Sequence, residues 1–457
     1  MTLTEGVTMQ TELWNDAAGG FHPVSAPDFL PAARLEEVQL RRLRAVVARA
    51  FEHVPLFRRR LEQRGLTPEA IGSLADSALL PFTVKTDLRD TYPFGLFASP
   101  MGDVVRLHAS SGTTGKPIVV AYTREDVDVW AEVMARTFAA CGLHRGDILQ
   151  NAFGYGLFTG GLGAHYGAEA LGATVIPVSG GNTERQLMVL RDFGVSALCC
   201  TPSYFVHLIE RAKDVGVDLK DLPLRVGVFG AEPWSDAMRQ HIESEAGVRA
   251  YDIYGLSEII GPGVASECAA QDGLHVFEDH FYPEIIDPDT GASRPDGEEG
   301  ELVLTTLSKK AMPMIRYRTR DITRIISEPC SCGRTLRRIQ RIGRRSDDMI
   351  IIRGVNVFPS QVEAALLQVE GTCPITGSSS PASAGWIRWR LRWRLRPRSS
   401  ATRSAPWRRC VPGSPRPSSR SAASGSICAW WSRAPSSAAR ARRGGSSTSV
   451  TCNLADD

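Results

Sequence analysis

The pattern of apolar and polar positions changes character along this chain. Residues 33–43 place leucine and valine at helical spacing, and much of the first 100 residues has the polar, helical character of this segment. From Asp126 to about Gly261, helical segments alternate with short apolar runs, which predict parallel strands buried under helices. Residues 273–327 are richer in turns and strands. The predicted strands are 173–178, 197–201, 224–230 and 301–306.

A loop rich in hydroxyls and glycine stands between two further predicted strands, 104–109 and 118–122. Its backbone N–H groups, hydroxyls and single ammonium suit a polyphosphate, and its glycines allow close approach to an anion. It is not a Walker A loop, because only two residues separate its glycines and a strand follows. A flexible turn is the alternative. The loop residues are Ser110, Ser111, Gly112, Thr113, Thr114, Gly115 and Lys116.

Composition indicates a globular protein with room for two or three domains. The chain has 457 residues, of which 43% are hydrophobic and 23% charged. No apolar run reaches the length of a membrane span, and the first residues lack the features of a signal peptide. We therefore expect a cytoplasmic protein without membrane contact. Its ten cysteines are then thiols or metal ligands rather than disulfides.

The net charge of +3 conceals a strong asymmetry. After Glu370 the chain has fifteen Arg, no Lys and two acidic residues, so this segment carries +13 and the preceding residues carry −10. Six of the nine Trp also lie in this tail. We expect residues 371–457 to be disordered, because they show little aliphatic core and no helix or strand period.

The loop at 110–117 resembles the phosphate loop of the adenylate-forming superfamily of acyl-CoA synthetases, and later motifs follow in the superfamily's order. Residues 81–90 and 351–363 are similar to phenylacetate-CoA ligases in particular. The resemblance, from about Pro81 to Glu370, implies an α/β adenylate-forming fold. A large domain, 1–345, would combine helix-covered sheets with a β-rich subdomain. A small α+β C-terminal domain would begin at 346–370 and remain incomplete.

The same resemblance implies an aryl acid, ATP with Mg²⁺, and CoA as reaction partners. The acid would form an acyl-adenylate with release of pyrophosphate, and CoA would then displace AMP. Transfer to a carrier-protein thiol and a non-catalytic binding protein are the alternatives. Nucleic acid is not the expected partner, and the oligomeric state stays open, a homodimer included.

Two stretches resemble parts of the nucleotide site. Residues 251–258 resemble the superfamily's YGxTE motif, here containing Tyr254, Gly255, Ser257 and Glu258. The family roles carried over are adenine stacking for Tyr254 and Mg²⁺ binding for Glu258, which suits a cation that prefers oxygen ligands. A solvated glutamate at a helix start is the alternative for Glu258. The turn Gly230-Ala231-Glu232-Pro233 follows a predicted strand, and we expect Glu232 and Pro233 in a first helical turn.

Three further expectations depend on the resemblance. Residues 316–321 are similar to the YRTGD motif, with Arg320 in place of Gly, and Asp321 would bind the ribose hydroxyls. Arg345 would contact nucleotide as a catalytic residue beside Lys116 and Glu258, and Asp347 would be the hinge of the small domain. An acyl pocket would lie beside the segment 151–161, which suits a flat aryl ring. Its residues would be Phe153, Tyr155, Gly156 and Phe158.

A second site involves sulfur. Cys268 and His275 are separated by six residues, and Cys330 and Cys332 form a Cys-x-Cys-Gly turn. Four such ligands from two segments suit a closed structural Zn²⁺ site. Four free residues are the alternative, because the pairs are far apart in the sequence and the first spacing differs from that of zinc fingers.

The tail raises a question about activity. Shifting the frame near Gly371 can turn part of the tail into an alternating amphipathic strand, so we expect a frameshift there. A nucleic-acid-binding Arg/Trp tail is the alternative. In this superfamily a lysine late in the C-terminal domain assists adenylation, yet the last lysine here is Lys310. The chain as printed is therefore predicted to be impaired.

Overall fold

The computed structural model describes residues 22–110 and 117–346, and beyond them only short strands. The chain divides into two compact units, Met1–Gln361 and Val362–Asp457. Ser111–Lys116 of the predicted phosphate loop and the predicted hinge Asp347 lie outside the described residues.

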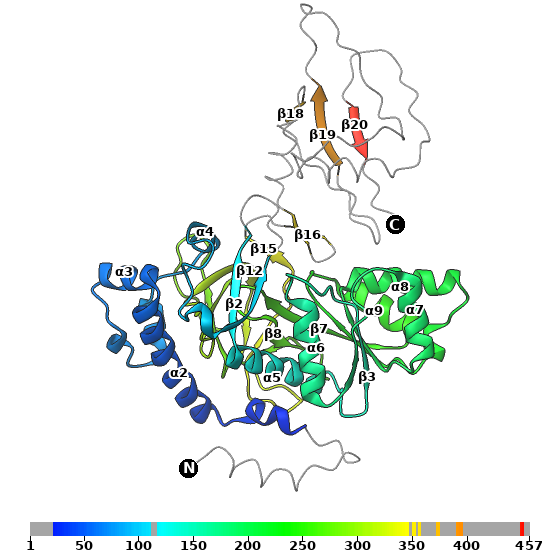
Figure 1. The fold of residues 1–457 in the computed structure, drawn as a ribbon, viewed down its shortest axis with the longest axis horizontal. Coiled ribbons are helices and arrows are strands. Elements are labelled where there is room, and N and C mark those ends of the chain that lie inside the picture. The colour runs from blue at the N-terminus through cyan, green and yellow to red at the C-terminus, as the bar shows by residue number, and fades with distance from the viewer. Residues whose placement is uncertain are drawn as a thin grey trace, which may run out of the picture. The chain divides into compact units, whose positions relative to one another are not determined.

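A nine-stranded sheet forms the centre of the first unit (Figure 1). Its parallel part is buried at every position of β5 and β6, as expected for strands covered on both faces. Its spatial order is β13-β14-β9-β8-β7-β6-β5-β3-β4. The parallel strands are β3 (Ile148–Asn151), β4 (Thr174–Ile176), β5 (Ala197–Cys200), β6 (Val226–Phe229) and β7 (Arg249–Leu256). The antiparallel ones are β8 (Gly261–Ser266), β9 (Leu274–Val276), β13 (Ile325–Ile326) and β14 (Arg338–Ile339).

A second, four-stranded antiparallel sheet has the order β10-β11-β12-β15. Its strands are β10 (Phe281–Ile286), β11 (Gly300–Thr306), β12 (Tyr317–Thr323) and β15 (Arg344–Arg345). Two hairpins complete the unit. They are β1 (Val104–Ala109) with β2 (Val119–Thr123), and β16 (Ile350–Ile352) with β17 (Val355–Val357).

Helix α5 has a start that the sequence encodes. Thr123 and Asp126 form a capping box at the first turn of α5, which satisfies backbone N–H groups that have no helical partner. Figure 1 shows α7, α8 and α9 grouped at one side of the sheet, and α5 and α6 side by side in front of it. The helices are α2 (Ala32–His53), α3 (Pro55–Gln63), α4 (Lys85–Asp90), α5 (Arg124–Ala140), α6 (Gly160–Leu171), α7 (Thr183–Asp192), α8 (Pro202–Asp214) and α9 (Asp236–Ala246).

The predicted mixed α/β class is confirmed, and most predicted strands are found. β1 has its predicted bounds, and β11 begins one residue earlier than expected. β4 is shorter than predicted and ends before Pro177, which has no N–H to donate to a neighbouring strand. The four-residue strand β3 was not among the predicted strands.

One local prediction is wrong. Glu232 and Pro233 do not begin a helix, because α9 starts at Asp236 and is capped by Ser235, whose hydroxyl accepts from Met238 N at 3.2 Å. Glu232 instead accepts a hydrogen bond from Ser203 N at 2.7 Å. Its carboxylate therefore lies at the first turn of α8, where a negative charge is favourable.

In the second unit the structure describes three short antiparallel strands. They are β18 (Thr372–Pro374), β19 (Arg390–Leu395) and β20 (Thr448–Thr451). The other residues of the tail lie outside the described ones, so the disordered tail stays a prediction.

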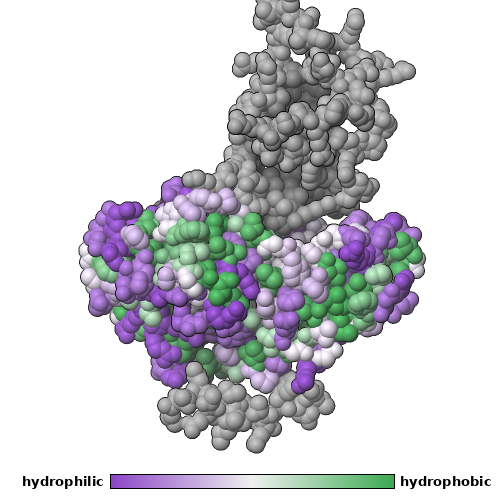
Figure 2. Space-filling model, in the orientation of Figure 1, coloured by the Kyte–Doolittle hydropathy of each residue, from purple (hydrophilic) through white to green (hydrophobic). Residues whose placement is uncertain are grey.

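The surface of the first unit mixes residue types. Figure 2 shows hydrophilic and hydrophobic residues interspersed over the face in view. Within the described part of the chain, each helix is too short or too polar to cross a bilayer.

The contact between α5 and α6 depends on a missing side chain. A Cβ added at Gly167 would lie 2.2 Å from Met134 Cβ, and both helices are regular at this point. We predict that Gly167→Ala lowers the free energy of unfolding by about 1–3 kcal/mol, the usual cost of overpacking a core. Gly102→Ala is the control, because nothing lies within 4 Å of its added Cβ and its φ is not positive. Equal urea midpoints for the two variants would contradict this account of the helix contact.

Candidate active site

Strand β12 sorts its side chains by alternation. Tyr317, Thr319 and Asp321 are buried, whereas Arg318 and Arg320 are partly exposed. This is the period of two expected for a strand, in which successive side chains point to opposite faces. Arg318 and Arg320 both pair with the buried Glu301 of β11, at 2.6 and 3.4 Å. The buried side chains Tyr317 and Asp321 point to the other face of the strand, where the candidate site lies.

Asp321 lies at the meeting point of three strands. Tyr254 of β7 donates its hydroxyl to Asp321 Oδ2 at 2.6 Å, and Arg345 Nη1 of β15 lies 2.5 Å from Oδ1. Asp321 and Arg345 are also direct neighbours in the antiparallel pairing of β12 with β15. Burial, reinforced by the charge of Asp321, raises the pKa of Tyr254 well above its ordinary value, so the phenol stays protonated and donates. Motifs far apart in the sequence thus share one hydrogen-bonded group.

Glu258 occupies the turn between β7 and β8, not the start of a helix. Its side chain is 8% exposed, which rules out the alternative of a solvated surface residue. Tyr317 donates its hydroxyl to Glu258 Oε1 at 3.3 Å, and Lys85 Nζ lies 3.8 Å from the same oxygen. β12 therefore contributes to both carboxylate groups: its Tyr317 bonds Glu258, and its Asp321, four residues later, is the second carboxylate.

The Glu258 turn is held by several independent contacts. Lys309 Nζ donates to the carbonyl oxygen of Glu258 at 3.2 Å, and the Tyr122 hydroxyl donates to the carbonyl of Ile260 at 2.9 Å. Ser257 Oγ lies 3.1 Å from Thr159 Oγ1. Such contacts fix the carboxylate before any ligand arrives, which is what electrostatic preorganisation requires.

Gly255 has a steric reason to be glycine. A Cβ at this position would lie 2.0 Å from the carbonyl oxygen of Gly261, on the facing strand β8. β7 and β8 can therefore approach closely just before the Glu258 turn. The glycine of the motif serves the backbone that presents the glutamate.

Lys309 is a site residue that sequence reasoning missed. Its ammonium is 5.0 Å from the centre of the Tyr122 ring, and burial lowers its pKa to about 8. Its neighbour Lys310 is half exposed and pairs with Glu125 at the surface. The sequence gives no sign of which of the two adjacent lysines is buried. The backbone conformation of the loop determines that the side chain of Lys309 points inward. Lys310 N and Ala311 N both donate to the Asp126 carboxylate, at 2.6 and 2.9 Å.

The hairpin that carries the predicted phosphate loop is closed at its base. Ser110 N donates to the carbonyl of Ile118 at 2.9 Å. Ala109 N and a ring nitrogen of His108 lie 2.9 and 3.0 Å from the carbonyl oxygen of Leu157. The loop therefore begins directly beside the segment predicted to line the acyl pocket.

The predicted pocket residues lie in different environments. Phe153 is buried in the main core, and Phe158 is 38% exposed. The Tyr155 hydroxyl accepts from Asn151 Nδ2 at 2.8 Å, and burial raises its pKa to about 12. Gly156 is exposed and has a φ of 156°. Tyr155 and Phe158 are thus the aromatic side chains of this segment with open surface.

The turn after β6 also contacts the nucleotide motif. A Cβ at Gly230 would lie 2.7 Å from the backbone oxygen of Ile253, one residue before Tyr254. Ala231, the next residue, has a φ of 68°, in the left-handed region. The chain therefore passes close to β7 before it turns away toward α9.

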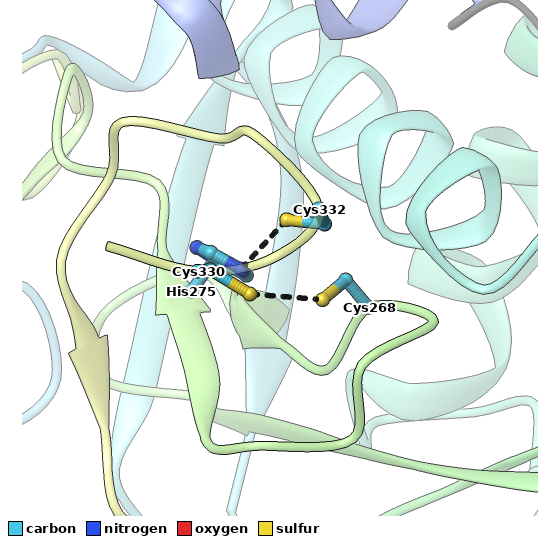
Figure 3. Close-up of side chains that lie close together, drawn as sticks. All are labelled: Cys268, His275, Cys330 and Cys332. Atoms are coloured by element: carbon cyan, nitrogen blue, oxygen red, sulfur yellow. Dashed lines mark hydrogen bonds between the residues drawn. The ribbon is translucent and has the colours of Figure 1, made fainter. Parts of the chain in front are cut away.

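The four predicted sulfur and imidazole ligands come together (Figure 3). Cys268, Cys330 and His275 are buried, and Cys332 is half-buried. This group shares no residue with the carboxylate site: Cys268 lies in the β8–β9 connection, His275 on β9, and Cys330 and Cys332 in the β13–β14 connection.

Known proteins share this arrangement of sequence and fold. The model of the AMP-binding enzyme family matches residues 70–308. The phenylacetate-coenzyme A ligase of Pseudomonas putida is 56% identical over 337 residues, which cover 74% of this chain and 76% of that protein. That of Escherichia coli (strain K12) is 54% identical over 342 residues, covering 74% and 78%. The chain belongs to the phenylacetate-coenzyme A ligase family of AMP-binding enzymes. It is an acid–thiol ligase that joins an acid to CoA through an adenylate.

A solved structure supports the fold assignment. A 2-hydroxyisobutyryl-CoA ligase, crystallised with 2-HIB-AMP and CoA in the thioesterification state, has a TM-score of 0.73 and 33% identity. The match covers 76% of this chain and 75% of that chain. The predicted adenylate-forming fold is thereby confirmed.

The buried ammonium leads to a prediction about Mg²⁺-dependent ATP binding. Lys309→Met should weaken ATP binding in the presence of Mg²⁺ roughly tenfold, because a charged hydrogen bond to the Glu258 turn is lost. It should not lower stability, since a desolvated charge is removed with it. Calorimetric titrations with and without Mg²⁺ measure this. Lys310→Met is the matched control, and equal affinities for the two variants would contradict the role of Lys309.

The lowered pKa of Lys309 also predicts how stability and ATP affinity change with pH. The pKa of Lys309 lies near 8, below its ordinary value of 10.5, so the unfolded chain binds more protons between these pH values. The contribution of Lys309 to stability therefore rises with pH across this window. Mg²⁺-dependent ATP affinity should fall over the same window as the ammonium loses its proton, and Lys309→Met should lack this part of the change.

Proposed function

We propose that this chain ligates phenylacetate, or a close aryl acid, to CoA through an acyl-adenylate, with AMP and pyrophosphate as products. The observation that carries the proposal is the buried carboxylate of Asp321, bonded to both Tyr254 and Arg345, together with the buried carboxylate of Glu258. These residues belong to motifs in the order used by adenylate-forming enzymes. The four curated relatives that are 54–56% identical to this chain are named phenylacetate-coenzyme A ligases, and these names favour phenylacetate as the acid.

Each residue of the group suits one part of ATP. Asp321 would accept hydrogen bonds from the ribose hydroxyls, with its orientation fixed by Tyr254 and Arg345. Tyr254 would stack beside the adenine, with Gly230, Ala231 and Glu232 on the neighbouring turn. Arg345 would contact the nucleotide from β15. The loop Ser110–Lys116 would wrap the phosphates.

Glu258 would hold Mg²⁺. Its carboxylate is buried and its turn is fixed, and carboxylate oxygen is the ligand type that this cation takes beside nucleotide phosphates. A bound Mg²⁺ would neutralise phosphate charge. The protein's own contribution is to orient the acid against the α-phosphate and to place Lys116 and Lys85 near the developing charge, so that catalysis is mainly positioning and electrostatic stabilisation. Rotation of the small domain about Asp347 would then admit CoA.

An aryl ring would bind beside the segment 151–161. Tyr155 and Phe158 keep open surface there, and the base of the phosphate loop is hydrogen-bonded to Leu157. This adjacency would bring a carboxylate held near the aromatic side chains toward the phosphates. Flat aromatic walls favour an aryl acid over a long flexible one.

The printed chain lacks one group that this reaction uses in the superfamily. An ammonium that neutralises charge as the carboxylate attacks would come from a lysine late in the C-terminal domain, and none follows Lys310. Arg is a poor replacement, because its planar fork differs from a compact point charge. We therefore propose that the printed polypeptide is impaired in the first half-reaction.

Restoring the reading frame near Gly371 tests this proposal. The restored version should release pyrophosphate in an acid-dependent manner at least about 10²-fold faster than the printed chain, the usual effect of one preorganised group. Both should bind ATP similarly, because the described nucleotide residues are shared. Comparable rates would show that the tail is genuine and that the frameshift argument is wrong.

Acid preference tests the substrate. In the frame-restored version we expect phenylacetate to be used in preference to acetate and long-chain fatty acids in pyrophosphate release. The printed chain should likewise bind a supplied phenylacetyl-adenylate more tightly than acetyl-adenylate. A fatty acid that outperforms phenylacetate would overturn the aryl assignment and leave the ligase chemistry intact.

A further inference from the structure

A second cluster of reactive side chains is formed by residues other than Tyr254, Asp321, Arg345 and Glu258. Cys268, His275, Cys330 and Cys332 bring one ligand atom each into a cluster in which all four atoms lie within 4.8 Å of one another. Figure 3 shows the four side chains pointing toward one another from two separate segments. Cys268 Sγ and Cys330 Sγ are 3.7 Å apart, and Cys332 Sγ lies 3.4 Å from His275 Nε2.

The sheet explains why distant residues meet. His275 lies on β9 and is the direct neighbour of Arg338 on β14. The turn containing Cys330 and Cys332 precedes β14, and Cys268 follows β8, the other neighbour of β9. Strand pairing therefore places β9, which carries His275, between the two strands next to which the cysteine segments lie.

The histidine is oriented by a partner outside the cluster. His275 Nδ1 lies 3.0 Å from the carbonyl oxygen of Leu336. An Nδ1–H donated to this carbonyl leaves Nε2 as the lone-pair nitrogen, and Nε2 is the atom that faces Cys332. Metal-binding histidines are typically held in this way.

We propose that Cys268, His275, Cys330 and Cys332 bind one Zn²⁺ as a structural site. Three thiolates and one imidazole form a closed tetrahedral set, which leaves no position for substrate. Thiolate ligands favour Zn²⁺ over Mg²⁺, which takes oxygen ligands. The thiol protons are released to solvent as the metal binds. A Cys268–Cys330 disulfide would use only two of the four groups.

The surroundings explain what a metal would add. Among the residues that the structure describes, the local apolar cluster has Ala140, Cys268 and Cys330 as its buried members, with Ala270 and Cys332 packed beside them. This is too little apolar surface to fix a turn of chain. A Zn²⁺ ion would tie the turn at 330–333 to the β8–β9 connection.

The residues that follow the cysteine turn connect it to two other parts of the chain. Next to the turn, Arg334 Nε pairs with Asp28 Oδ2 at 2.9 Å, which attaches the N-terminal part of the described chain. Beyond β14, Arg341 pairs with Asp252 of β7 at 3.0 Å, and the chain continues to Arg345. The zinc site would therefore fix the start of the segment 330–345, and the end of this segment, Arg345, pairs with Asp321.

Another acidic cluster in the structure does not compete for this role. Glu132, Asp279 and His280 also lie close together, but the guanidinium of Arg136 is bonded to Asp279 at 2.9 and 3.1 Å. Arg136 is fully buried, so its charge already neutralises this group. A cation there would meet a fixed positive charge.

Metal analysis of the full chain tests the proposal. Protein purified under reducing conditions without chelator should contain about one zinc per chain. Cys332→Ser and His275→Ala should lose it, whereas Cys199→Ala, which removes a buried thiol outside the cluster, should keep it. When Co²⁺ is added after removal of zinc, a thiolate-to-cobalt absorption band typical of tetrahedral sites should appear. Wild-type protein without zinc that also fails to take up Zn²⁺ or Co²⁺ would overturn the site.

Hydrogen exchange tests the clamp even if a variant folds poorly. Removing zinc from the wild-type chain should speed amide exchange in residues 328–341 and leave α2 unchanged. Identical exchange in both regions with and without metal would refute the structural role. Neither measurement uses ATP or acid, so its outcome is independent of the proposed ligase site.

Discussion

The buried carboxylate of Asp321 is the group on which the site depends. A lone carboxylate in the core would be costly, and here it accepts a hydrogen bond from Tyr254 and pairs with Arg345. Each partner comes from a different strand, so the contact also joins the nine-stranded sheet to the four-stranded one. Removing either partner would leave Asp321 underpaired, which is usually more harmful than never having had the pair.

The same logic extends through the site. Glu258 is buried near Lys85 and Tyr317, and Lys309 is buried against the backbone of its turn. The shifted pKa of Lys309 shows that its burial is unfavourable for folding, which is expected where a charge is kept for function. Charges in this region are thus held in place at some cost to stability. The result is a Glu258 carboxylate that the fold itself holds in position.

Much of the fold could be predicted because it follows from local pattern. β1, β11 and the alternation of helices with buried strands follow from periodicity, and the order of short motifs identified the family. A cluster of Cys268, His275, Cys330 and Cys332 was one of two alternatives left open by the residue types and the Cys-x-Cys-Gly turn, and the structure brings the four side chains together. The physical reason is that strand pairing and ligand chemistry leave clear marks in a sequence.

Other features depend on tertiary contacts that leave no such mark. Lys309 and Lys310 are identical in type, and only the docking of their loop onto Asp126 buries the first. The start of α9 was misplaced because Glu232 caps a different helix, α8. Arg320 has a φ of 68° at a position where the related motif has glycine. This conformation costs about 1–2 kcal/mol for a residue with a side chain, and Arg320 compensates through two contacts with Glu301.

The most direct test of this account asks whether Asp321 recognises ribose. Calorimetry should compare ATP with 2′-deoxy-ATP and 3′-deoxy-ATP on the wild-type chain and on Asp321→Asn. If Asp321 accepts hydrogen bonds from the ribose hydroxyls, the wild-type chain should bind at least one deoxy analogue roughly tenfold more weakly than ATP. Asp321→Asn should lose most of that discrimination. A wild-type chain that binds all three nucleotides equally, or a variant that discriminates as well as the wild type, would contradict the account.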